Sequence, residues 1–158
     1  MTQQSLHVFC AGDQTPEDAG LRFAINQVEY SNSPDGPVIH IFGRDAAGKA
    51  AQVRVTGFQP YFYAPAERAD VLPPHPKTKV DHTTEYRSIR GEVLRRIYTL
   101  TPGDVREVRD YYAPHFEADI PFATRYLIDL GLTGGIETPA CETDFSRVLP
   151  AEVQAPAR

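Results

Sequence analysis

Cysteine, positive charge and long apolar runs are all scarce in this sequence. The 158 residues contain only two cysteines, Cys10 and Cys141, which predicts free thiols in a reducing compartment rather than a disulfide framework. No Cys/His spacing suits zinc, and the five histidines occur singly. The first residues lack a basic region followed by an apolar run, and no stretch is long enough to span a bilayer. We therefore expect a cytoplasmic location and no metal or other cofactor in this chain.

The surplus of charge is negative. Aspartate and glutamate number 21 against 16 lysines and arginines, a formal net charge of -5. A small free-standing nucleic-acid-binding protein is usually basic, because phosphate contacts dominate its affinity. The charge balance therefore argues against strong independent binding to DNA. It is compatible with a module that contributes a pocket while another part of a larger protein supplies phosphate affinity.

Motifs for catalysis are also missing. The segment TGGIETP, residues 133–139, lacks the Lys-Ser/Thr pair of a phosphate-binding loop, and no Gly-x-Ser-x-Gly occurs. Three acids, Glu137, Glu142 and Asp144, could hold a metal, but they lie in a Gly/Pro-rich tail where solvated charges are the simpler interpretation. We predict no catalytic residue in this chain.

Alternating apolar and polar residues predict a sheet. Two helices are predicted in addition. The first covers residues 101–114, with Thr101 as its cap and Pro102 at the first helical position; the second covers residues 121–132. The order of elements predicts an α+β fold in which two helices pack on a mixed, mainly antiparallel sheet. The predicted strands are residues 21–30, 37–45, 50–57, 58–64, 93–100 and 115–120.

The composition also predicts a domain organisation. Residues 1–20 are polar and read as a flexible leader, and residues 21–137 form the folded domain. The four prolines between residues 65 and 79 indicate a connecting loop. Residues 138–158 are interpreted as a linker.

An aromatic string and an arginine cluster stand out as candidate binding features. Side chains alternate along a strand, so Phe58 and Phe62 share one side while Tyr61 and Tyr63 share the other. One pair is expected in the core, and the other is a candidate surface for stacking bases. A second candidate is a group of arginines that could contact phosphates, although a solvated or internally paired face explains them equally well. These are Arg87, Arg90, Arg95 and Arg96.

Two segments resemble the hallmark sequences of a known family. FQPYFYAP (58–65) and FEADIPFATRYLIDLGL (116–132) are similar to segments of the amino-terminal domain of archaeal family B DNA polymerases, and the resemblance extends over residues 22–137. It implies the fold of that domain, binding of single-stranded template DNA, and capture of uracil in the template strand. Carried over position by position, the uracil pocket would consist of Tyr30, Pro60, Tyr61, Pro102, Val105, Ile120, Phe122 and Arg125.

The resemblance gives these residues distinct roles. Tyr30, Pro60 and Phe122 would be flat walls for the base, and backbone groups of Tyr61 and Ile120 would read its edge. Val105 would line the entrance. The last member, Arg125, would position a phosphate or brace the pocket; a helical ion pair with Asp129 is the alternative.

The family also implies partners that this chain lacks. No Asp-x-Glu exonuclease motif occurs in the sequence, so polymerising and proofreading activities, with their magnesium ions, are expected in exonuclease and palm domains outside it. Those domains, or a separate polymerase subunit, are the expected protein partners. Two alternatives remain open: a general single-strand binding module that uses the tyrosines and arginines, and a purely structural domain.

Overall fold

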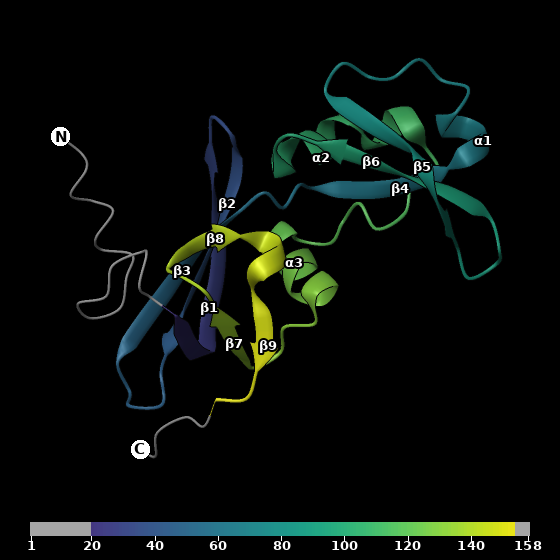
Figure 1. Ribbon diagram of the computed structural model, residues 1–158. Coiled ribbons are helices and arrows are strands. Elements are labelled where there is room, and N and C mark those ends of the chain that lie inside the picture. The colour runs from purple at the N-terminus through teal and green to yellow at the C-terminus, as the bar shows by residue number, and fades with distance from the viewer. Residues whose placement is uncertain (1–19, 154–158) are drawn as a thin grey trace. The chain divides into compact units, whose positions relative to one another are not determined.

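The computed structural model describes residues 20–153, which form two compact units. Unit 1 contains residues 20–58 and 123–153, and unit 2 is Gln59–Phe122. Both combine β-strands with short helices (Figure 1), and the strands are almost all antiparallel. The predicted α+β class is therefore confirmed. The predicted leader lies outside the described residues except for Gly20, as do residues 154–158.

Unit 1 is built on a six-stranded sheet of order β8-β3-β2-β1-β7-β9. All neighbours pair antiparallel except β3 and β8, which run parallel. One α-helix, α3 (Phe122–Leu130), and one 3₁₀ turn, η3 (Phe145–Arg147), complete the unit. The strands are β1 (Leu21–Ser33), β2 (Gly36–Arg44), β3 (Ala50–Thr56), β7 (Gly135–Thr138), β8 (Glu142–Asp144) and β9 (Leu149–Ala151).

The core of unit 1 follows from the alternation in its strands. Ile39, Ile41, Val53 and Val55 are fully buried, as expected for β-branched residues on the inner face of a sheet. From α3, Tyr126 packs its ring edge-on against Phe58 with ring centroids 5.0 Å apart. Helix and sheet thus bury their apolar faces against each other.

A glycine allows the close approach of β1 and β2. The register between them shifts between Ile25 and Gln27, which marks a β-bulge. Opposite it, a Cβ at Gly43 would lie 1.8 Å from the backbone oxygen of Ala24. Any larger residue at Gly43 would therefore separate the strands at this point.

The segment interpreted as a linker is folded in its described part. Residues 135–151 supply β7, β8 and β9, and β7 pairs with β1 from Leu21↔Thr138 onward. Ile136 and Val148 are fully buried. These strands are only three or four residues long, too short for their alternation to stand out among glycines and prolines.

The prediction of free cysteines is wrong for Cys141. This residue is buried and disulfide-bonded, and Cys10 lies outside the described residues. Among residues 20–153, no helix is both long enough and apolar enough to cross a membrane.

Unit 2 is a three-stranded antiparallel sheet with helical segments. The strand order is β4-β6-β5, and a cluster of apolar residues including Phe62, Ile97, Val108 and Tyr112 forms its core. Its elements are β4 (Tyr61–Pro65), α1 (Ala66–Ala69), β5 (Thr78–Arg87), β6 (Val93–Thr99), α2 (Pro102–Val108) and η2 (Arg109–Tyr112).

The start of α2 confirms the predicted helix signals. The Thr101 hydroxyl accepts a hydrogen bond from the Asp104 amide, and the Asp104 carboxylate accepts one from the Thr101 amide, both at 3.3 Å. This is a capping box with Pro102 at the first helical position. The helix changes to the 3₁₀ turn η2 after Val108, which turns Tyr112 into the core, where its hydroxyl lies 2.7 Å from that of Thr78.

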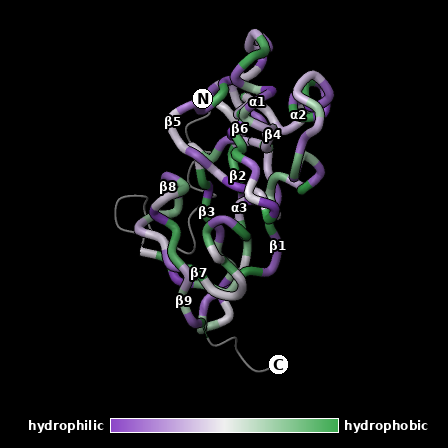
Figure 2. Tube along the Cα trace, turned by 90° about the vertical axis from the view of Figure 1, so that its right-hand side faces the viewer, coloured by the Kyte–Doolittle hydropathy of each residue, from purple (hydrophilic) through white to green (hydrophobic). Residues whose placement is uncertain are grey.

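Two other segments of unit 2 differ from the sequence prediction. The predicted loop, residues 65–79, contains α1 and the first residues of β5. The strand β5 escaped prediction because it is largely hydrophilic (Figure 2) and half-exposed, so it shows no apolar alternation. The strand predicted at residues 115–120 is reduced to a single bridge between Tyr63 and Phe116.

Candidate nucleic-acid interface

The two sides of β4 have different environments, as the alternation predicts. Phe62 is fully buried in the core of unit 2. On the other side, the ring of Tyr63 lies 5.6 Å from that of Tyr61 and 5.4 Å from that of Tyr86, and the ring of Tyr98 lies 5.7 Å from that of Tyr61. We call Tyr61, Tyr63, Tyr86 and Tyr98 the tyrosine cluster.

Arg96 lies among these four rings. Its guanidinium carbon is 4.1 Å from the centroid of Tyr61 and 4.5 Å from that of Tyr86. The guanidinium also donates hydrogen bonds to the hydroxyls of Tyr63 at 3.1 Å and Tyr98 at 3.4 Å. Burial works against the charge, but these hydrogen bonds outweigh it and raise the pKa of Arg96. The cation is therefore engaged in cation–π contacts that fix the rings.

The other predicted phosphate-contacting arginines differ in their engagement. Arg95 forms a two-point ion pair with Asp70, with both N···O distances 3.1 Å, and this pairing lowers the pKa of Asp70. Arg87 donates to the carbonyl of Gly91 at 2.8 Å and pairs with Glu85 at 3.1 Å. The Arg90 side chain has neither a hydrogen bond nor an ion pair to any residue in 20–153. Of the four arginines, Arg90 is therefore the one whose guanidinium is best placed to bind an anion.

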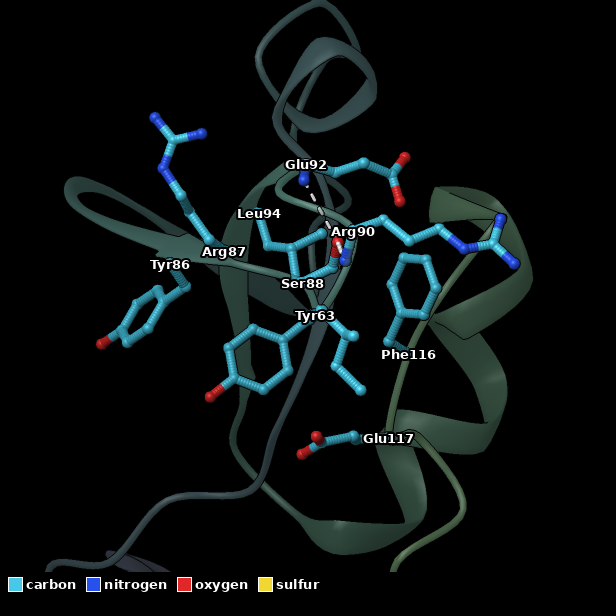
Figure 3. A pocket seen from close by; sticks show the side chains of 10 residues that line it. Tyr63, Tyr86, Arg87, Ser88, Arg90, Glu92, Leu94, Phe116 and Glu117 are labelled. Carbon is cyan, nitrogen blue, oxygen red and sulfur yellow. Dashed lines mark hydrogen bonds between the residues drawn. The ribbon is translucent and has the colours of Figure 1, made fainter.

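A hollow of about 730 Å³ lies beside the tyrosine cluster in unit 2. Figure 3 shows the rings of Tyr63 and Phe116 on opposite sides of it, with the carboxylate of Glu117 below them and the side chain of Arg90 extending past Phe116. Tyr86 contributes a further aromatic wall.

Six of the eight predicted uracil-site residues belong to unit 2. Pro60 precedes β4 and its carbonyl accepts from the Thr99 amide at 3.0 Å, while Tyr61 begins the strand. Pro102 opens α2, Ile120 is half-buried before α3, and Phe122 is buried at the first position of α3.

Val105, which the resemblance places at the entrance of the uracil pocket, lies in the core of unit 2. Its side chain is 8% exposed and belongs to the core cluster with Phe62 and Val108. Phe62 and Tyr61 project to opposite sides of β4. The side chain of Val105 therefore packs on the side of the sheet opposite the Tyr61 ring.

The remaining two predicted residues belong to unit 1. Tyr30 lies on β1 opposite Ile39 and is 40% exposed. Arg125 lies on α3 and is 5% exposed. These two residues therefore belong to a different compact unit from the six residues above.

The three acids considered as metal ligands have protein partners. Glu137 pairs with Arg22 at 3.6 Å and Glu142 with Arg54 at 3.2 Å, while Asp144 accepts hydrogen bonds from the amide and hydroxyl of Ser146. Within residues 20–153, no group of three or more metal-ligating side chains comes together.

Sequence reasoning missed several residues of this surface. Tyr98 could have been found, because it lies two positions after Arg96 on the same predicted strand and so shares its side. Tyr86 and Phe116 could not, since their proximity to Tyr63 depends on the register of β5 and on the bridge from Tyr63 to Phe116. Neither pairing leaves a local signal in the sequence.

Comparison with known proteins finds relatives that are DNA polymerases. DNA polymerase 2 of Aeropyrum pernix is 33% identical over 131 residues, covering 71% of this chain and 16% of that polymerase. The DNA polymerase of Thermococcus gorgonarius is 31% identical over 126 residues, covering 68% of this chain and 16% of that polymerase. No protein-family model matches the chain.

The fold has a counterpart among solved structures. The family B DNA polymerase from the hyperthermophilic archaeon Pyrobaculum calidifontis superposes with a TM-score of 0.65 and 22% identity, over 87% of this chain and 21% of that one. The relatives described above define the class of this chain as the DNA polymerases of archaea. Within it, the chain belongs to the archaeal family B DNA polymerases, consistent with their amino-terminal domain, and spans 16% of the length of the curated relatives compared above.

Proposed function

We propose that this chain binds single-stranded template DNA as part of a DNA polymerase and recognises uracil in that strand. Membership of the polymerase family supports the binding of template DNA. The two hallmark segments support the assignment of the eight uracil-site residues. The observation that carries the proposal is the direction of the peptide groups of Tyr61 at the edge of β4.

Backbone hydrogen bonds define that direction. Groups of successive residues in an antiparallel strand point alternately to the two sides. Pro60 bonds to Thr99 on the β6 side, whereas Tyr63 exchanges two hydrogen bonds with Phe116, at 3.0 and 2.8 Å, on the opposite side. Tyr61 shares the parity of Tyr63, so its N–H and C=O are directed away from β6. The segment from Phe116 leads on to Ile120, the second proposed reader.

A fixed backbone donor and acceptor would discriminate between pyrimidines. Uracil presents an N3 donor beside an O4 acceptor, whereas cytosine presents an N3 acceptor beside an N4 donor. Cytosine in the same position would leave buried groups unmatched, at a cost of about 1–3 kcal/mol each. Thymine differs from uracil by its methyl group, which rigid walls would exclude by overpacking worth about 1–3 kcal/mol.

We also propose that other domains of the polymerase complement this function. In the full polymerase, exonuclease and palm domains would hold the catalytic magnesium ions and supply most phosphate contacts, which fits the acidic balance of this chain. A template base that is already single-stranded can enter a pocket at low unstacking cost.

Equilibrium titration with three labelled oligonucleotides tests the proposal. They differ at one central position, which is uracil, thymine or cytosine. The wild-type chain should bind the uracil strand at least roughly tenfold more tightly than either other strand. Equal affinities would refute uracil recognition and favour general single-strand binding, and no binding to any strand would refute both.

A further inference from the structure

The hollow beside the tyrosine cluster is separate from the proposed uracil site. None of the eight predicted uracil-site residues lines it. Its walls include the rings of Tyr63, Tyr86 and Phe116 together with the side chain of Leu94 (Figure 3). Its volume of about 730 Å³ falls in the range of roughly 300–1,000 Å³ that is typical of small-ligand pockets.

The aromatic walls are held in place by their own contacts. Tyr63 and Phe116 exchange two backbone hydrogen bonds, so the strand positions of the two facing rings are fixed relative to each other. The Tyr63 hydroxyl accepts from Arg96, whose guanidinium also lies over the ring of Tyr86 at 4.5 Å. One cation therefore orients two of the three rings, which lowers the entropy lost when a ligand stacks on them.

Arg90, the arginine proposed to bind an anion, lies on a tight turn. Ser88 closes the turn: its hydroxyl accepts from the amides of Arg90 at 3.2 Å and Glu92 at 3.1 Å. Arg87 adds a hydrogen bond to the carbonyl of Gly91, which has the left-handed φ of +88° that favours glycine. The backbone of the turn is thus well fixed, while the Arg90 side chain makes no hydrogen bond or ion pair within the described part of the chain.

The distribution of charge gives the hollow two different ends. Glu117 lies below the rings in Figure 3, and its backbone adopts φ 62°, a conformation uncommon outside glycine and often found at functional sites. Glu92 also lines the hollow, on the same turn as Arg90. The Glu117 carboxylate disfavours a phosphate at its own end, so an anionic group is directed toward the end that carries Arg90.

We propose that this hollow binds one nucleotide of single-stranded DNA, with the base stacked on the aromatic walls and a phosphate at Arg90. Aromatic faces accept any base, so the site is indifferent to sequence. The inference rests on the proposed binding of a single strand but not on uracil recognition. It adds a second point of contact, which would hold the strand while a different base is read.

Binding of a uracil-free probe tests the inference. A fluorescein-labelled oligodeoxyadenylate is titrated with the full chain at low ionic strength. Tyr86→Leu, which removes the ring, should weaken binding roughly 5- to 150-fold, and Tyr86→Phe, which keeps it, should bind within about twofold of wild type. Arg90→Ala should weaken binding and reduce the slope of log affinity against log salt by about 0.7, the value for one phosphate contact on a single strand.

Arg68→Ala is the matched control, because Arg68 is exposed on α1 and does not line the hollow. It should leave affinity and salt slope at the wild-type values. Wild-type binding by Tyr86→Leu and Arg90→Ala overturns the inference even where the chain prefers uracil. Weaker binding by both variants supports it even where the chain shows no uracil preference, so the two proposals fail separately. Absence of binding to the probe by the wild-type chain overturns this inference outright.

Discussion

The guanidinium carbon of Arg96, on β6, lies 4.1 Å from the centre of the Tyr61 ring on the neighbouring strand β4. The sequence left two interpretations of Arg96 open, a phosphate contact or an internally paired arginine, and its hydrogen bonds go to the tyrosine hydroxyls. Its charge therefore acts inside the protein, where it orders the side of β4 that carries Tyr61 and Tyr63. This makes Arg96 a determinant of the geometry of the proposed interface.

Replacing Arg96 should destabilise unit 2. Arg96→Met keeps much of the stem but removes the cation and both hydrogen bonds, so we expect a loss of about 1–2 kcal/mol in the free energy of unfolding. Urea denaturation followed by tyrosine fluorescence measures it. Arg106→Met, at an exposed position of α2, is the control. Equal stability of the two variants would show that the contacts with the rings contribute nothing.

Two valines of α2 separate pocket function from core packing. Val105 is 8% exposed, whereas Val108 is fully buried. Val105→Gln changes the less buried of the two, so it should cost less stability than Val108→Gln. Because Val105 is the proposed entrance residue, this substitution should also abolish the preference for uracil over thymine. Val108→Gln buries a polar group and should cost about 1–3 kcal/mol. Thermal unfolding and the two-strand titration are measured on both variants; a folded Val105→Gln that still prefers uracil would remove Val105 from the site.

The helix cap at Thr101 gives a prediction for local stability. Thr101→Ala removes the acceptor for the Asp104 amide and should cost about 1 kcal/mol. Thr101→Ser retains the hydroxyl and should be nearly neutral. Chemical denaturation of the pair checks this, and an Ala variant as stable as the Ser variant would mean that the cap does not limit the stability of unit 2.

The ion pair of Asp70 predicts an acid sensitivity. Its hydrogen bonds with Arg95 lower the folded-state pKa below the ordinary 3.8. The stabilisation is therefore fully present above the unfolded-state pKa and is lost as pH falls through the folded-state pKa. Melting temperatures between about pH 6 and about pH 3 should fall more steeply for wild type than for Asp70→Asn.

Glu67→Gln, at an exposed position of α1, is the control for that titration. It should follow the wild-type curve. A parallel fall for wild type and Asp70→Asn would show that the Arg95–Asp70 pair contributes no pH-dependent stability, as is common for exposed pairs.

Local signals were sufficient for much of the fold. The capping residue Thr101, the helical position of Pro102 and the alternation around Phe62 predicted α2 and the two sides of β4 correctly. The missed strands β5 and β7–β9 are hydrophilic or very short, so pairing with neighbours determines them and no local pattern does. A class of fold could be predicted, but the division into two units could not.

The candidate site likewise combines features that the sequence predicts with features that only the pairing of strands determines. The uracil-site residues came from family resemblance, since nothing local distinguishes Pro60 or Ile120 from ordinary loop residues. The environment of Arg96 depends on the register that places it opposite Tyr63. Of the four clustered arginines, Arg87, Arg95 and Arg96 have different protein partners, whereas the Arg90 side chain has none among residues 20–153. Cross-strand register, unlike periodicity, is not encoded in any single segment.

The amide resonances of Tyr61 and Ile120 provide the most direct test of backbone recognition. In a ¹⁵N-labelled chain titrated with strands that differ only by uracil or thymine, both amides should shift with the uracil strand and remain nearly unchanged with thymine. The amide of Val53, in the core of unit 1, should not respond to either strand. Identical shifts of Tyr61 and Ile120 with both strands, or no shift with uracil, would contradict the account.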